Sequence, residues 1–301
     1  MSRRLVWRLA LPVIAVTLAC NLGAATSPAT PVATGGVAPT MDTVTPTQPA
    51  VEPPPAATLP ESFGVVYYVR PDGGNSEQCT GLADSPYPGS GASQACAWDH
   101  PFRALPPGGT PRIVGGDTLI IASGEYQMGF GAPGSETCDE GGSFDCHMPP
   151  IPSGPDSQHP TRILGSGWDT GCGNPPELWG SGRPWFIVNL TGASNIEMSC
   201  FEITDHSSCV ENHSGDLACE RDNLPYGDWA AYGLTAEDSV NVLLRDLNIH
   251  GLAAGGVHAG RLTDWTVENV RIAGNGSVGW DGDLWDEGGD SNSGTLIFRH
   301  W

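Results

Sequence analysis

The sequence predicts an all-β chain wound into a right-handed parallel β-helix of about four recognisable coils, with long disulfide-bearing loops. The main observation is a repeat, because residues 233–251 align without a gap with residues 256–274, an offset of 23 residues (256 − 233). Within each repeat, apolar and polar residues alternate in three short bursts, which is the period of a β-strand. Glycine, Asp and Asn separate the bursts, where a chain bends. A fixed short period indicates units that stack on one another.

The pattern extends in both directions from the two repeats. Towards the N-terminus, three bursts match at residues 188–190, 196–198 and 201–203. Residues 205–230 show no alternation and are expected to form a loop. Forwards, residues 279–283 match residues 256–260, and Leu296 and Phe298 resume the pattern after an insertion of about eight residues. Trp301 falls inside a coil. We therefore expect the folded part to be truncated at its C-terminus.

Composition favours one turn-rich β domain, since the chain has 41 Gly, 27 Pro and only 16% charged residues. All 13 basic residues are Arg, so no mechanism with a Lys base is available. The net charge of −21 makes nucleic acid and anionic membrane surfaces poor partners. An acidic polysaccharide would need a metal or a local Arg cluster to bind. We expect a monomer.

The N-terminus has the features of a secretory signal over residues 1–19, in which three Arg residues precede an apolar stretch. This stretch is too short to span a membrane. Residues 17–20 resemble the lipobox of bacterial lipoproteins, and the resemblance implies that Cys20 is lipidated and anchors an exported protein on the extracytoplasmic side. An ordinary signal peptide is the alternative. Residues 20–62, rich in Pro and Thr, cannot bury a core and are expected to form an extended tether.

Nine cysteines also fit an exported protein, because eight remain when Cys20 is set aside. An even number in an exported chain predicts disulfides. The count does not fix the connectivity, since eight cysteines allow 105 pairings. We expect pairs between sequence neighbours in loop-like segments, 79–96, 138–146 and 209–219. Pairing of Cys172 with Cys200 stays open, because Cys200 takes the bend position of Asp246. A zinc site is the alternative, but no CxxC pair occurs. The eight cysteines are Cys79, Cys96, Cys138, Cys146, Cys172, Cys200, Cys209 and Cys219.

Three segments near the start of the folded part, residues 65–74, 101–105 and 115–126, resemble the pectin-lyase-like β-helix family. In that family a first strand is followed by a capping segment and then by the motif that begins here at Gly116-Asp-Thr-Leu-Ile-Ile. Together with the repeats, the resemblance covers residues 63–301. It implies a fold rather than a reaction, because the fold hosts lyases, hydrolases, epimerases and adhesins. Residues 127–184 are expected to form a long loop around a short coil at residues 162–165.

The candidate site is a row of polar residues on the first strand of successive coils, made up of Asn189, Thr235, His258 and Asp281. Stacked strands lie roughly 4.8 Å apart, so these side chains should be neighbours. His258 beside a carboxylate is a candidate base. The resemblance implies that this sheet lines a substrate groove, and it makes Arg261 a further candidate base near bound calcium. The alternative is a solvated polar row without chemistry.

Glu237 and Trp285, together with Asn189 and Thr235, are the expected substrate-binding residues. Five carboxylates follow one another closely at the end of the row and form the candidate metal site. Calcium, which takes six to eight oxygen ligands, suits such a loop; a solvated acidic loop is the alternative. The five residues are Asp281, Asp283, Asp286, Glu287 and Asp290.

Another row, Arg245, Glu268 and Arg299, alternates in charge and is expected to fix the register of the stack. The features together predict a cell-surface lipoprotein whose β-helix binds, and in one hypothesis cleaves, a polysaccharide. If it is an enzyme, the resemblance implies a polysaccharide lyase or a glycoside hydrolase. The alternative is a non-catalytic surface spacer or adhesin.

Overall fold

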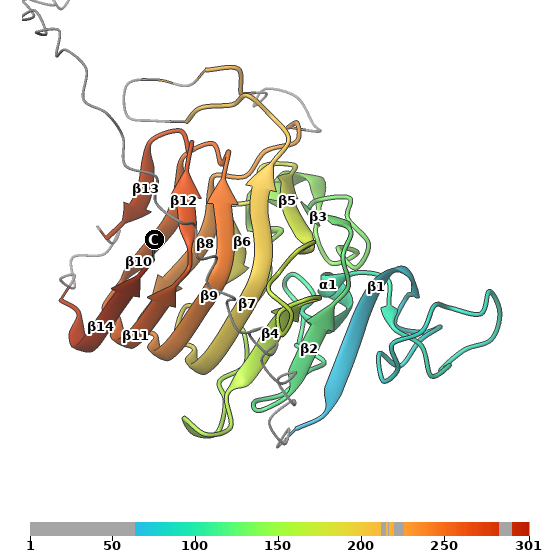
Figure 1. Cartoon of the computed structure of the whole chain (residues 1–301). Helices are drawn as coiled ribbons and strands as arrows, with labels where there is room; N and C mark the ends of the chain where they lie inside the picture. The colour runs from blue at the N-terminus through green and yellow to red at the C-terminus, as the bar shows by residue number, and fades with distance from the viewer. Residues whose placement is uncertain (1–63, 212–214, 216, 220–225, 283–290, 301) are drawn as a thin grey trace, which may run out of the picture. The chain divides into compact units, whose positions relative to one another are not determined.

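The alternating bursts of the repeats form short parallel strands (Figure 1). The computed structural model describes residues 64–300 except 212–214, 216, 220–225 and 283–290, and these residues belong to one unit, 54–301. Its strands form a ten-stranded sheet in the order β1-β2-β4-β7-β9-β11-β14, with β12 on β9 and β3-β5 beside β7, and a four-stranded sheet in the order β13-β10-β8-β6. The elements are β1 (Val66–Gly74), α1 (Pro101–Ala104), β2 (Thr118–Ile121), β3 (Glu125–Gly129), η1 (Glu140–Asp145), β4 (Thr161–Gly165), β5 (Glu177–Ser181), β6 (Phe186–Asn189), β7 (Ser194–Asp205), β8 (Tyr232–Glu237), β9 (Val240–His250), β10 (Gly255–Gly260), β11 (Thr263–Glu268), β12 (Arg271–Ala273), β13 (Val278–Asp281) and β14 (Ser293–Arg299).

The two repeats pair in parallel at the 23-residue offset that the alignment predicts. Leu234 is the partner of Val257, and Val242 is the partner of Trp265. The pairing also continues backwards through β6 and β7 and forwards through β13 and β14. The predicted all-β class and parallel pairing are therefore confirmed.

The core lies between the two sheets and consists of the apolar residues of successive bursts. Equivalent residues of neighbouring strands stack on one another, so that each apolar side chain is covered from both sides. Removing this surface from water stabilises the fold by roughly 25 cal/mol per Å². Ile272, the partner of Ile249, is only partly buried. The other inward residues of the two repeats are at most 2% exposed, and they are Leu234, Ala236, Val242, Leu244, Leu247, Ile249, Val257, Ala259, Trp265, Val267 and Val270.

Single residues in the left-handed region turn the chain between bursts. Asp246 and Asn269, with φ of 53° and 59°, occupy equivalent bends, and the amide Nδ2 of Asn269 donates to Asp246 Oδ1 at 2.6 Å. Asp and Asn tolerate this conformation better than most residues. The sequence predicts three strands per coil, but β9 runs through the bend at Asp246 and contains two bursts. One left-handed residue changes the direction of the strand without interrupting its pairing.

Glycine begins each repeat because the neighbouring chain passes very close. A Cβ at Gly256 would lie 2.7 Å from the carbonyl oxygen of Gly279 and 2.6 Å from Ile272 Cγ2. At Gly233 it would lie 2.8 Å from the carbonyl oxygen of Gly256 and 2.9 Å from Ile249 Cγ2. Contacts under 3.0 Å require the structure to shift.

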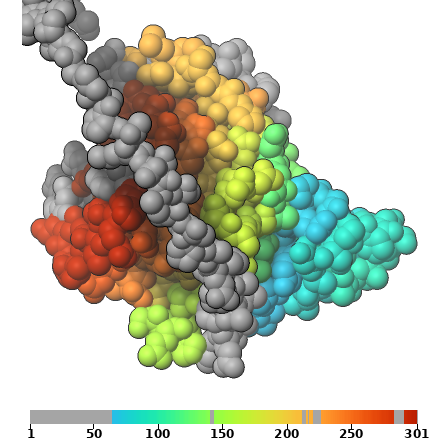
Figure 2. Space-filling model, viewed as in Figure 1, coloured from blue at the N-terminus to red at the C-terminus, as the bar shows by residue number. Residues whose placement is uncertain are grey.

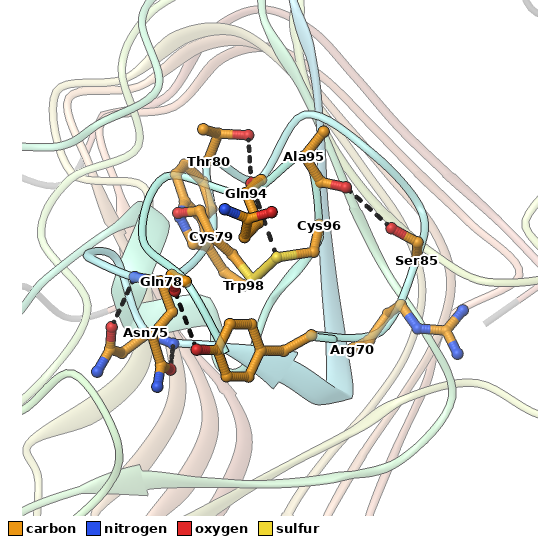
Figure 3. Close-up of a disulfide and its surroundings, with 12 residues drawn as sticks. Arg70, Asn75, Gln78, Cys79, Thr80, Ser85, Gln94, Ala95, Cys96 and Trp98 are labelled. Carbon is orange, nitrogen blue, oxygen red and sulfur yellow. Dashed lines mark hydrogen bonds between the residues drawn. A yellow bond between two sulfur atoms is a disulfide. The ribbon is translucent and has the colours of Figure 1, made fainter. Parts of the chain in front are cut away.

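The predicted first strand and capping segment correspond to β1 and α1. β1 pairs in parallel with β2, and the segment between them is tied by the Cys79–Cys96 disulfide (Figure 3). Around it, the indole Nε1 of Trp98 donates to the Cys79 carbonyl at 3.0 Å, and the Thr80 hydroxyl donates to the Gln94 carbonyl at 3.1 Å. These contacts hold an irregular segment that has few strand hydrogen bonds of its own.

The three expected cysteine pairs, 79–96, 138–146 and 209–219, are disulfides in the structure, and so is the pair left open, 172–200. Cys200 does take a bend position, with φ of 68°, and its disulfide ties the residues around Cys172 to β7. Four disulfides indicate an extracytoplasmic protein.

The interpretation of residues 127–184 as one loop around a short coil is only partly correct. The short coil is β4, but β5 follows it and pairs with both β3 and β7. Leu178 is buried among Pro and Gly neighbours, too few apolar residues to produce a recognisable burst. Residues 205–230 contain no strand beyond Asp205 among those described, as expected.

The expected signal, Cys20 and the tether lie outside the described residues. Within the described part of the chain, no helix has the length and apolar character needed to cross a bilayer.

Gly256→Ala is expected to lower the free energy of unfolding by about 1–3 kcal/mol, because the new methyl group overpacks the contact with the next strand. Urea unfolding with the disulfides intact measures it. Gly173→Ala is the matched control, since a Cβ there meets no atom within 4 Å, and its effect should stay within about 0.5 kcal/mol. Equal stability of the two variants would contradict the close-approach explanation.

Candidate functional site

The predicted polar row exists as a set of strand neighbours on the four-stranded sheet. Asn189 pairs with Thr235, Thr235 with His258, and His258 with Asp281. Asn189, Thr235 and His258 are 6%, 5% and 2% exposed. The row is therefore largely withdrawn from solvent rather than being a solvated surface ladder. Its chemical roles stay predictions.

Tyr232, a residue that was not predicted from the sequence, brings a second polar group to His258. Its ring centroid lies 5.3 Å from that of His258, and its hydroxyl donates to Asp281 Oδ2 at 3.5 Å. The ring lies across Gly255, where a Cβ would be 2.6 Å from Tyr232 Cε1. Burial, followed by the charge of Asp281, raises the pKa of Tyr232 to about 12. The hydroxyl therefore keeps its proton at neutral pH.

Glu237 lies near His258, and Arg261 in turn contacts Glu237. Glu237 Oε1 lies 4.0 Å from His258 Nδ1, and Arg261 Nη2 lies 3.6 Å from Glu237 Oε2. Arg261 also donates from Nε and Nη2 to Asp238, at 2.6 and 2.8 Å. The hydrogen bonds from Arg261 lower the pKa of Asp238. The role of Arg261 as a base stays a prediction.

The predicted metal site falls mostly on residues outside those described. Asp281 is described, whereas Asp283, Asp286, Glu287 and Asp290 are not, and neither is the expected sugar-binding Trp285. Elsewhere in the described chain, no group of three or more His, Cys, Asp or Glu residues could hold a metal ion. Calcium at this loop stays a prediction.

An open groove of about 390 Å³ lies on the outer face of the ten-stranded sheet. It crosses β4, β7, β9, β11 and β14, and Ser157, Gln158 and Pro160 also line it. Figure 2 shows the surface around residues 150–160 in yellow-green next to the orange surface of the central strands. Along the floor, strand pairing places Arg162, Glu197, Leu243 and Thr266 in one row.

Ion pairs connect the strands along this groove. Arg162 Nε lies 2.8 Å from Glu197 Oε2, and Glu268 Oε2 lies 3.5 Å from Arg245 Nε and 3.7 Å from Arg299 Nη2. The predicted row of Arg245, Glu268 and Arg299 is thus confirmed. The two pairs of Glu268, with the exposed side chains of Arg245 and Arg299, contribute only about 0–1 kcal/mol each. The three arginines face Glu197, Glu268 and Asp264 in the same lining, so the groove is nearly neutral.

A third group of polar residues lies on β5, β7 and β9 and at His206, directly after the end of β7. His206 Nε2 is 2.9 Å from Glu177 Oε1, and His250 Nε2 is 2.6 Å from Glu202 Oε1. His206 also stacks on Trp179, with ring centroids 4.3 Å apart. This group was not predicted from the sequence, because β5 was not recognised as a strand and Glu177 could not be aligned with Glu202, its strand partner. The signal that could have indicated this strand is the alternation in residues 177–179, Glu-Leu-Trp, where one buried apolar residue lies between two outward-facing residues.

Asp205, beside this group, is 7% exposed, and burial raises its pKa to about 7 in spite of hydrogen bonds from Ser207 and Ala230. An unfolded Asp titrates near pH 3.9. Between about pH 4 and 7 the native state therefore binds more protons than the unfolded state, and stability should fall as pH rises through this window.

Asp205→Asn is expected to flatten this fall, because the amide does not titrate. The free energy of unfolding, measured in urea at intervals from pH 4 to 8, should decrease less for the variant than for the wild type. Parallel curves for the two proteins would show that Asp205 ionises normally.

Comparison of the chain with protein-family models, with curated proteins and with solved structures found no match.

Proposed function

We propose that this protein is an exported right-handed parallel β-helix that binds a polysaccharide in the groove over β4, β7, β9, β11 and β14. The 23-residue register, the two parallel sheets and the bends at equivalent residues support this fold. Crossover connections between parallel strands are almost always right-handed, which supports the hand.

The observation that carries the binding function is the shape and lining of the groove. It is open, it crosses five strands, and it presents guanidinium donors and carboxylate acceptors in rows. Successive strands place outward side chains roughly 4.8 Å apart, a spacing close to the length of a sugar unit. A polymer with regularly repeated hydroxyl groups complements such a surface.

The charge of the groove favours a neutral glycan. Its arginines are already close to Glu197 and Glu268, so no excess of positive charge is available for a polyanion. The remaining N–H groups of Arg162, Arg245 and Arg299 can donate to hydroxyl oxygens. Leu243 lies half-buried on the floor among them and offers an apolar contact to a sugar ring.

Leu243→Arg is expected to weaken the binding of a neutral glycan at least about tenfold, roughly 1.4 kcal/mol, because the longer charged side chain fills the floor. Native gel electrophoresis through dextran, xylan and soluble cellulose derivatives measures the retardation. Val114→Arg, at a residue 64% exposed and outside the groove, is the matched control. The proposal fails if no neutral glycan retards the wild type, or if both variants are retarded equally.

Cleavage at the His258 row is a second candidate function, favoured by the contacts around His258. Tyr232, protonated at neutral pH, can act as an acid, and the neighbouring imidazole can act as a base. Such a pair would fit a polysaccharide lyase or a glycoside hydrolase, with calcium bound at Asp281 and the acidic residues after it.

The same glycan panel, extended to polyuronates and run with calcium or with a chelator, decides between this candidate and a non-catalytic adhesin. New unsaturated or reducing ends that disappear in His258→Ala support cleavage. Binding without products supports the adhesin.

We further propose that Cys20 is lipidated and anchors the protein to the bacterial membrane through the tether of residues 20–62. The disulfides, which favour an extracytoplasmic location, and the lipobox-like residues 17–20 support this. In the producing bacterium, Cys20→Ser should move the protein from the membrane fraction to the soluble exported fraction. An unchanged distribution would argue against the lipid anchor.

A further inference from the structure

Arg183 differs from the other arginines of the described chain because its side chain makes no hydrogen bond and no ion pair there. Its Nε is buried and without a partner. The other described arginines each contact a carboxylate or another acceptor, and they are Arg70, Arg103, Arg112, Arg162, Arg245, Arg261, Arg271 and Arg299. In a chain with a net charge of −21, an arginine without a carboxylate partner is unexpected.

Three aromatic rings surround the Arg183 guanidinium. Its Cζ lies 5.5 Å from the ring centroid of Phe144, 5.9 Å from that of Tyr226 and 5.6 Å from that of Trp229. Cation–π attraction holds the guanidinium in this position. We call Arg183 and these three residues the Arg183 cage. Its members come from η1, from the connection between β5 and β6, and from the segment before β8.

The backbone indicates that the side chain at this position matters. Arg183 has φ of 63°, in the left-handed region that glycine adopts without strain. Its N–H donates to the Trp229 carbonyl at 3.0 Å, which fixes the conformation. Left-handed residues occur at ligand clamps as well as at bends such as Asp246.

We propose that the Arg183 cage binds the carboxylate or sulfate group of an anionic sugar. The planar guanidinium can donate two parallel hydrogen bonds to such an oxyanion. Phe144 and Tyr226 are half-buried, so part of each ring can pack against the apolar face of the same sugar. No protein carboxylate lies within ion-pair distance of Arg183 among the described residues, so the oxyanion has no internal competitor.

This site is independent of the groove, since none of its four residues lines it. The groove suits a neutral glycan because its charges are balanced, whereas the Arg183 cage has a single unbalanced positive charge. The two sites can therefore be tested with different probes on the same protein.

The test compares the binding of dextran sulfate, polygalacturonate and unmodified dextran to the full chain by isothermal titration calorimetry at physiological ionic strength. Arg183→Gly should lower the affinity for the anionic probe at least about tenfold and leave dextran binding unchanged. Glycine suits the left-handed backbone, so this variant should stay folded, with its four disulfides and a melting temperature within a few degrees of the wild type. Arg183→Gln should lose the same binding.

Arg271→Gln is the matched control, because Arg271 is exposed, bonds only the Asn248 amide oxygen among the described residues, and changes the net charge equally. It should bind the anionic probe like the wild type. The proposal is overturned if neither anionic probe binds the wild type, or if the Arg183 variants bind as tightly as Arg271→Gln. If the wild type binds an anionic probe and the Arg183 variants do not, competition by free sulfate or by galacturonate identifies which oxyanion the cage prefers. Loss of dextran binding alone would concern the groove and not this site.

Discussion

Parallel hydrogen bonding between residues 23 apart is the constraint on which the rest of the structure depends. It places Leu234 beside Val257 and Thr235 beside His258, so one register sets both the core and the outward rows. A slip of one residue would move every apolar side chain to the outside. The close approach at Gly256 and the left-handed bends at Asp246 and Asn269 fit only this register.

The same register gives the two sheets different outer faces. On the ten-stranded sheet, charges alternate from strand to strand and compensate each other, which leaves an open and nearly neutral groove. On the four-stranded sheet, Tyr232 lies over Gly255 and reaches Asp281, so the polar row around His258 becomes a buried cluster. Burial of this kind changes proton affinities, as the raised pKa of Tyr232 illustrates.

The irregular segments between strands bring together side chains that strand pairing does not. The segments around Cys79, Cys138, Cys172 and Cys209 have little regular pairing, and disulfides hold them against the strands. The Arg183 cage is built from such segments. Phe144 precedes the connection between β5 and β6 in the sequence, Trp229 follows it, and the rings of both residues lie against Arg183. Its guanidinium has no partner carboxylate among the described residues, in contrast to the arginines on the strands.

The sequence by itself determined the all-β class, the register of the repeats, the polar row at Thr235, His258 and Asp281, and the even number of cysteines available for disulfides. Each of these follows from a local period or a count, and parallel stacking converts equal sequence offsets into contacts. Only the tertiary structure decided that β5 pairs with β7, that Tyr232 reaches Asp281, and that Arg183 lies among three rings. These contacts join segments of unequal spacing across loops, where side-chain packing, not periodicity, sets which residues meet.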